Sequence, residues 1–312
     1  MDSSASIKRI IGIDIGGTNI RAGIYSSDGA LSHFTKSSSQ SLFEEVDASV
    51  ERLIHYVEHL MEQNGGQGID AIAIGFPSTL DHDRKVVVST PNLKGLNNCP
   101  IVSLLEEALN IPVFIERDVN LLTLYDMADL HLSEQGVTLA FYLGTGLGNA
   151  IVINGEFLVG KNGAAAELGH IPMRDIHGLC GCGNTSCVEI EASGKALEAL
   201  KTELFPHEPL EKIFVNHSDH PALQRFVEGI AYPLATEINI FDPDHVILGG
   251  GVISMEGFPY HRLESKVHEL LRKPYPSRSL EVNFSRGGQK CGVVGAGMYG
   301  LKMLERRSTE KK

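Results

Sequence analysis

The sequence has no long apolar run, no stripe of basic residues and no periodic glycine. No hydrophobic stretch approaches the roughly 18–20 residues of a membrane-spanning helix, so no membrane association is expected. Lys and Arg (27) are outnumbered by Asp and Glu (39), and the net charge of −12 argues against broad nucleic-acid binding. The 33 glycines follow no period, which excludes a collagen-like chain. With a short, polar start at residues 1–6, we expect a soluble cytoplasmic protein.

Cysteine is scarce and unevenly spread. Three of the five cysteines crowd into "CGCGNTSC" at 180–187, while Cys99 and Cys291 stand alone, a poor pattern for disulfides. Three thiolates and one imidazole form the donor set of a closed, tetrahedral structural zinc site. We therefore predict a Zn²⁺ site, and the alternative is a group of buried free thiols beside an unrelated histidine. The predicted ligands are His170, Cys180, Cys182 and Cys187.

Two stretches share one pattern, in which a strand is followed by a glycine turn and a second strand. They contain "DIGGT" at 14–18 and "GTGLG" at 144–148. With 312 residues of which 42% are hydrophobic, the chain is expected to form two α/β domains. A purely structural duplication is the alternative to a cleft that grips one ligand from both sides. Apolar spacing also predicts strands at 69–77 and 111–116 and helices at 41–63 and 292–307.

The glycine turns are suited to phosphate. Consecutive glycines after a strand let backbone amides approach a phosphate closely. Thr18 adds a hydroxyl donor, Arg21 a planar guanidinium, and Asp14 a carboxylate that would orient Mg²⁺ through water. Neither turn matches the P-loop or the dinucleotide fingerprint, and an ordinary hairpin is the alternative. The predicted phosphate-binding residues are Asp14, Gly16, Gly17, Thr18, Arg21, Gly144, Thr145 and Gly146.

The motifs "DIGGTNIR", "RDVNLL", "LGTGLG", "AELGH" and "CGCGNTSCVEIEASG" occur in the order found in ROK sugar kinases, and the chain resembles that family from Ile10 to about Gly300. The segment "GFPSTLDHDRKVVVSTPNL" is most similar to the D-allose kinase branch. The resemblance implies an α/β, two-lobed actin/hexokinase-like (ribonuclease H-like) ATPase fold with a zinc-binding loop. The small lobe would comprise residues 1–117 and a C-terminal helix at about 295–312, and the large lobe residues 118–294.

The same resemblance implies a function: transfer of the γ-phosphoryl group of ATP, with Mg²⁺, to the 6-hydroxyl of a hexose, D-allose in this branch. Asp118 would be the catalytic base, although from the sequence alone an aspartate at a helix start is more commonly an N-cap. Gly249 and Gly250 of "LGGGV" would let adenosine lie against the backbone. A homodimer is expected from paralogues. The expected sugar contacts are Asn92, Asp118, Glu167, His170 and Glu189.

The chain departs from the family pattern at three places. Arg117 stands where many hexose-directed members carry Asn, and Ser78 stands where many carry Gly. The second glycine turn reads "GTGLGNA" and lacks its usual later glycine. The first two changes fall near the sugar and disfavour glucose, which, with N-acetylmannosamine, is the alternative substrate. Family repressors place a winged helix before the first turn, but only 13 residues precede Asp14 here, so a non-catalytic sugar sensor is less favoured.

Overall fold

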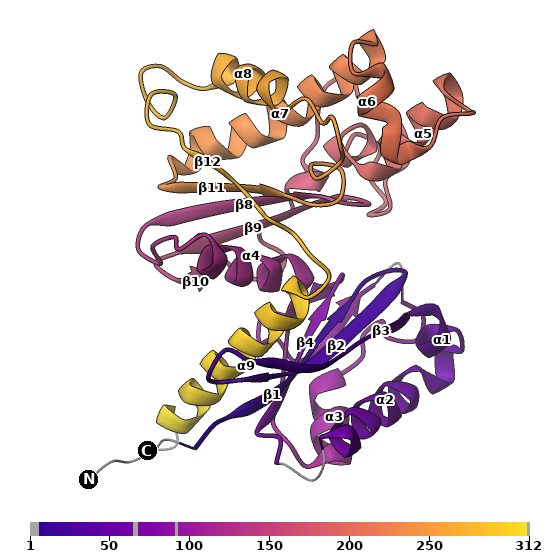
Figure 1. The fold of residues 1–312 in the computed structure, drawn as a ribbon, viewed down its shortest axis with the longest axis vertical. Coiled ribbons are helices and arrows are strands. Elements are labelled where there is room, and N and C mark those ends of the chain that lie inside the picture. The colour runs from indigo at the N-terminus through magenta and orange to yellow at the C-terminus, as the bar shows by residue number, and fades with distance from the viewer. Residues whose placement is uncertain (1–5, 65–67, 91–92, 311–312) are drawn as a thin grey trace. The chain divides into compact units, whose positions relative to one another are not determined.

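The computed structural model describes residues 6–64, 68–90 and 93–310. The chain divides into two compact units, each with its own five-stranded sheet (Figure 1). Unit 1 consists of Met1–Ala128, Val159–Ala165 and Gly288–Lys312, and unit 2 consists of Asp129–Leu158 and Ala166–Gly287. The chain therefore leaves and re-enters each unit, and the short segment Val159–Ala165 belongs to unit 1 although both of its neighbours in sequence belong to unit 2.

The sheet of unit 1 has the strand order β3-β2-β1-β4-β7. Strands β1, β2 and β3 are antiparallel neighbours, whereas β4 and β7 continue the sheet in parallel with β1. The turn at Asp28-Gly29 joins β2 to β3, and Gly29 has a φ of +88°, which favours glycine. The strands are β1 (Arg9–Ile15), β2 (Asn19–Ser26), β3 (Leu31–Ser38), β4 (Ala71–Phe76) and β7 (Val113–Arg117).

Alternate residues of β1 face two different layers of unit 1. Ile11 and Ile13 are fully buried in the apolar core that includes residues of helices α2 and α3. Ile10 faces the other way and packs against α9, where Gly12 allows close approach because a Cβ there would lie 2.3 Å from the carbonyl oxygen of Val293. These helices are α2 (Ser49–Gln63), α3 (Ile101–Leu109) and α9 (Cys291–Glu310).

The single helix predicted at 41–63 is wrong in its first turns. The structure has a short α1 (Gln40–Phe43) and a 3₁₀ turn η1 (Val46–Ala48), and only then α2. The hydroxyl of Ser49 donates to the carbonyls of Glu45 and Lys94, each at 2.9 Å. These side-chain bonds to the backbone compete with helical hydrogen bonds and fix the break.

Unit 2 repeats this plan with the strand order β10-β9-β8-β11-β12. An antiparallel hairpin again precedes a strand that joins in parallel, so the predicted repetition of the strand–glycine turn–strand pattern is confirmed. Helices α7 and α8 pack together over the core of this unit (Figure 1). The strands are β8 (Val137–Leu143), β9 (Leu147–Ile153), β10 (Glu156–Phe157), β11 (His245–Gly249) and β12 (Val282–Phe284). The helices are α5 (Gly194–Leu204), η4 (Leu210–Lys212), α6 (Ile213–His217), α7 (Pro221–Phe241) and α8 (Tyr260–Leu270).

Within the ranges that the structure describes, no helix combines the length and the apolar character needed to cross a membrane.

Candidate active site and metal centre

Two of the predicted acids lie at one edge of the sheet in unit 1. Asp14, near the end of β1, pairs with Gly75 of β4, and Gly75 pairs with Glu116 of β7. Asp118 follows immediately as the first residue of α4 (Asp118–Asp129). The carboxyl ends of parallel strands meet at one edge of the sheet. Strand β4 lies between β1 and β7, and neighbouring strands are about 4.8 Å apart, so the axes of the strands that carry Asp14 and Glu116 are roughly 10 Å apart. Asp14 and Asp118 therefore flank a common edge, where ligands bind in open α/β sheets.

Asp14 lies in a confined place. Burial raises the pKa of its carboxyl group above the ordinary value, and the guanidinium of Arg21, 3.3 Å away, opposes that rise. Helix α9 begins against this carboxyl group, since a Cβ on Gly292 would lie 2.5 Å from Asp14 Cγ. The Nε atom of Arg21 is buried and has no hydrogen-bond partner among the described residues. The Asp14 carboxylate is a suitable ligand for Mg²⁺ through a bridging water, and the Arg21 guanidinium beside it is a suitable hydrogen-bond donor to a phosphate oxygen.

The first glycine turn joins β1 to β2. It is closed by a hydrogen bond of 2.8 Å from the Gly16 N–H to the carbonyl of Asn19. Gly17 and Thr18 are exposed, so their polar groups are accessible. The turn remains compatible with both a hairpin and a phosphate-binding loop.

In unit 2 the second glycine turn, at 144–148, lies beside the glycine run that begins at Gly249. Gly249 pairs with Tyr142 at the ends of β11 and β8. Gly250 has a φ of +97°, and a Cβ there would lie 2.5 Å from the Leu143 carbonyl oxygen, so glycine is required by the fold. At Gly144, by contrast, an added Cβ would meet no described atom within 4 Å. The fold does not require glycine at this position, which favours a role in admitting a ligand.

Glu189 and the start of α5 hold the second glycine turn through hydrogen bonds. Glu189 Oε2 accepts a hydrogen bond of 3.0 Å from the Leu147 N–H, and a Cβ on Gly146 would lie 2.3 Å from that oxygen. The amide of Gly194 donates to Gly144 at 2.8 Å, and the next amide donates to Thr145 at 3.1 Å. Glu189, predicted as a sugar contact, therefore also fixes the shape of the glycine turn.

The four predicted metal ligands come together, and their donor atoms lie within 4.8 Å of one another. Cys180 Sγ is 3.5 Å from His170 Nδ1, and Cys182 Sγ is 3.5 Å from Cys187 Sγ. Tetrahedral zinc with Zn–S bonds of about 2.3 Å separates its sulfur ligands by about 3.8 Å, so the cluster fits this ion. Backbone hydrogen bonding at Asn184 lowers the pKa of the Cys182 thiol, whereas burial raises the pKa of the Cys187 thiol to about 12, so of these two Cys182 more readily supplies the thiolate that a metal binds.

The second ring nitrogen of the metal-site histidine faces Glu167. His170 Nε2 is 3.8 Å from Glu167 Oε2, while Nδ1 faces the thiols. At 3.8 Å the carboxylate oxygen lies near the ring but beyond hydrogen-bond distance of Nε2. The segments η2 (Leu168–His170), which follows Glu167, and η3 (Val188–Ile190), which contains Glu189, are neighbours. Asn92, the remaining predicted sugar contact, lies outside the described residues.

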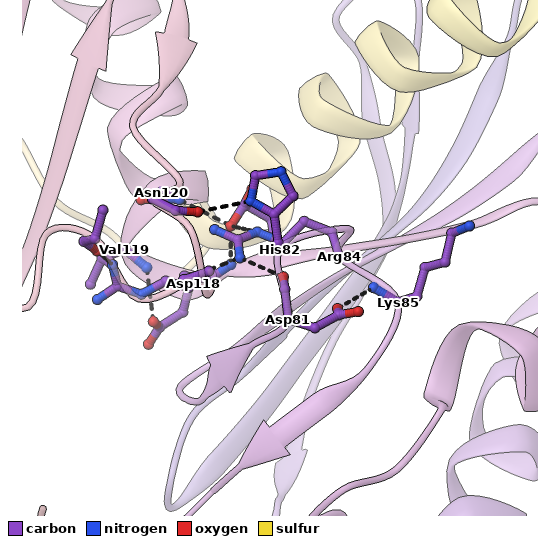
Figure 2. A network of polar contacts seen from close by, with 12 residues as sticks. Asp81, His82, Arg84, Lys85, Asp118, Val119 and Asn120 are labelled. Carbon is purple, nitrogen blue, oxygen red and sulfur yellow. Dashed lines mark hydrogen bonds and ion pairs between the residues drawn. The ribbon is translucent and has the colours of Figure 1, made fainter.

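Asp118 lies at a strand-to-helix junction with no intervening loop, since β7 ends at Arg117 and α4 begins at Asp118. Its Oδ1 accepts a hydrogen bond of 2.8 Å from the Val119 N–H (Figure 2). The side chain therefore bonds to the amide of the next residue, within the first turn of α4.

A buried ionic network beside Asp118 was not predicted from the sequence. Glu116 Oε1 accepts hydrogen bonds from the Arg117 N–H at 2.8 Å and from Asn120 Nδ2 at 3.0 Å. The same oxygen is 2.9 Å from Nε of Arg84, which points from the hairpin of β5 (Thr79–Leu80) and β6 (Val87–Ser89) toward the start of α4 (Figure 2). The one available signal was the polar pair "ER" at the end of the apolar strand "IPVFIER".

These features define an α/β protein of two five-stranded sheets with a cluster of three cysteines and one histidine in its second unit. The chain belongs to the ROK family, whose model matches residues 10–302. It is similar to the glucokinase of Thermotoga maritima, with 29% identity over 92% of this chain and 96% of that one. It is 30% identical to the N-acetyl-D-glucosamine kinase of Pectobacterium atrosepticum, over 93% and 98% of the two chains.

A solved structure gives the same result for the fold. The ROK family glucokinase from Streptomyces griseus, in complex with glucose and AMPPNP, aligns with a TM-score of 0.75 and 26% identity, covering 94% of this chain and 99% of that one. The chain therefore has the two-sheet ROK hexokinase-like fold, and the family prediction is confirmed.

Proposed function

We propose that the protein is an ATP-dependent sugar kinase that phosphorylates the 6-hydroxyl of a hexose, and that the hexose is D-allose. The observation that carries the proposal is the common sheet edge of Asp14 and Asp118. Phosphoryl transfer needs a site for the metal–phosphate group and a group that orients the acceptor hydroxyl, and these two acids supply both within one unit. The sugar kinases among the relatives agree with this reaction.

Asp118 orients the acceptor hydroxyl and takes its proton. In a loose transition state the proton leaves late, so a carboxylate held in the right direction is sufficient. Its place at the first turn of α4 puts it at the positive end of the helix dipole, which favours the charged form.

In unit 1, main-chain amides of the first glycine turn and Arg21 would hold phosphate oxygens, and Asp14 would hold Mg²⁺. The metal supplies positive charge to the phosphate oxygens. Within unit 2, we assign the open turn of Gly144 and Thr145 to phosphate, and Gly249 and Gly250 to adenosine.

The zinc ion has a structural role. His170, Cys180, Cys182 and Cys187 would supply all four ligands of a tetrahedral ion, which would leave no position for water or substrate. Zinc bound there would order the segments that carry Glu167 and Glu189, which we assign, with His170, Asn92 and Asp118, to the sugar hydroxyls.

D-Allose is favoured over glucose by the residues near the sugar. Ser78 and Arg117 replace the Gly and Asn of many hexose-directed relatives, and Nη1 of Arg117 donates to the carbonyl of Ala165 at 3.0 Å. Glucose and N-acetylmannosamine are the alternative substrates, and a homodimer remains our expectation for the assembly.

The proposal is tested by assaying a panel of hexoses with ATP and Mg²⁺. We expect the highest kcat/KM for D-allose. Asp118→Ala should lower kcat by about 10²–10⁴-fold, the usual contribution of general acid–base catalysis, with little change in sugar binding. Asp47→Ala, which removes an exposed carboxylate of the same unit, is the control. A higher kcat/KM for another hexose would refute the assignment of D-allose as substrate. Normal turnover by Asp118→Ala would show that Asp118 is not the catalytic base.

A further inference from the structure

The β5–β6 hairpin directs the guanidinium of Arg84 toward the interior of unit 1. Arg84 has a φ of +54°, in the left-handed region, and its side chain is only 10% exposed. Asp81 fixes this turn, because its Oδ1 accepts from the amides of Lys85 at 2.7 Å and Val86 at 2.9 Å. Figure 2 shows the result, with Arg84 between the hairpin and the first turn of α4. A strained turn that buries a charge is costly and calls for a specific use.

Arg84 contacts the carboxylate of Glu116, which accepts hydrogen bonds from residues on both sides of Asp118. Its Nε lies 2.9 Å from Oε1 of Glu116, whose side chain is 3% exposed. That same oxygen accepts from the residue immediately before Asp118 and from Asn120, two residues after it. The position of the Glu116 carboxylate therefore sets the geometry of the chain on both sides of Asp118.

The second task of Arg84 is to hold the segment Val159–Ala165. Arg84 Nη1 donates to the carbonyls of Asp81 at 2.9 Å and Gly163 at 3.2 Å. Arg117 donates to Ala165 of the same segment, so two buried arginines hold its carbonyls. The segment also packs closely on the hairpin, since a Cβ on Gly163 would lie 2.1 Å from the carbonyl oxygen of Leu80.

We propose that Arg84 is a positioning residue for Asp118, which it orients through Glu116 while anchoring Val159–Ala165 to the same hairpin. The inference rests on the proposed function for the role of Asp118. A guanidinium is suited to this task, because Nη1 donates to two carbonyls while the delocalised charge lies beside the Glu116 carboxylate, whereas a lysine ammonium offers a point charge.

Arg84→Met should lower kcat by about 10²-fold, the cost of misplacing a reacting group by about 1 Å, with KM for the sugar within about threefold. Arg84→Lys should restore little of this. The control is Arg52→Met, which removes a half-exposed arginine paired with Glu45 at 2.8 Å in the same unit, and it should leave kcat unchanged.

A double variant separates positioning from stability. Arg84→Met leaves Glu116 as a buried carboxylate without its cation, which destabilises the fold. Adding Glu116→Gln removes that charge while keeping an acceptor oxygen, so the thermal midpoint should recover and kcat should stay low. Recovery of kcat together with the midpoint would overturn the positioning role.

Hydrogen exchange tests the contact without reference to turnover. Arg84→Met should speed amide exchange in peptides covering residues 116–120 and 159–165 but not in α2, and Arg52→Met should not. Unchanged exchange in both peptides would overturn the inference. If the wild-type protein phosphorylates no hexose, the proposed function fails, and exchange still decides whether Arg84 holds this junction.

Discussion

Asn149, the residue in the place of the usual later glycine of the second turn, is fully buried in β9 and has a partner. Its Nδ2 donates to Glu237 Oε2 of α7 at 2.8 Å and to the carbonyl of Ala140 at 3.1 Å. Burial raises the pKa of the Glu237 carboxyl to about 7, and the hydrogen bond from Asn149 opposes the rise. The departure from the family pattern thus introduces a polar side chain that satisfies a buried acid.

Glu237 makes the stability of unit 2 depend on pH. Its pKa is higher in the folded state than the ordinary 4.5, so the folded state binds more protons, and stability falls as pH rises from about 4.5 to about 7. The shift corresponds to about 3 kcal/mol at full ionisation. Glu237→Gln should therefore match wild type at pH 4.5 and be the more stable protein at pH 8, by up to this amount.

The comparison uses thermal unfolding of both proteins across that pH range. Glu228→Gln, on the same helix and half-exposed beside Arg262, is the control and should show no such gain. A constant difference between Glu237→Gln and wild type from pH 4.5 to 8 would contradict a titrating buried carboxyl group.

At the scale of elements, the segment that carries the cysteine cluster is irregular. Only short 3₁₀ turns, η2 and η3, flank its cysteines. We expect about one zinc per chain, as for a closed four-ligand site, and near-complete loss in Cys182→Ser, with faster amide exchange at 168–190. Elemental analysis measures the metal. Cys99→Ser, outside the cluster, should keep the ion, and a zinc-free wild-type protein with ordered loop amides would contradict the prediction.

The elements that the sequence predicted best are those fixed by local pattern. The apolar residues of β1 lead directly into Gly16, and β1 and β4 formed where the pattern placed them. The helix at 41–63 was misjudged because Ser49 bonds to a carbonyl 45 residues away, which no local spacing reveals.

The candidate site divides in the same way. The cysteine spacing brought the metal ligands together as predicted, because close spacing limits how far apart they can lie. Arg84 and Glu116 are 32 positions apart, and their burial runs against the usual exposure of charged residues, so neither pattern nor composition indicated the pair.

At the scale of the whole molecule, unit 1 is completed only by the end of the chain. Helix α9 fits against β1 because it carries glycines at the contacts: a Cβ on Gly297 would lie 2.3 Å from Cβ of Tyr25, and one on Gly300 would lie 2.5 Å from a methyl carbon of Ile10. The helix covers an apolar layer that includes Ala73 and Leu121. Unit 1 therefore cannot acquire its full core before the last 25 residues have folded onto it.

A chain that ends at Gly287 should fold unit 2 and leave unit 1 open. Burying each large apolar side chain contributes about 1.5–3 kcal/mol, and several are uncovered, which is comparable with the roughly 5–15 kcal/mol that stabilise a whole domain. Amide exchange in β1 and β4 should accelerate strongly while β8 and β9 stay protected. A chain ending at Arg307, which keeps every α9 residue of the buried layer, is the control. Equal protection of β1 in all three chains would show that unit 1 folds without α9.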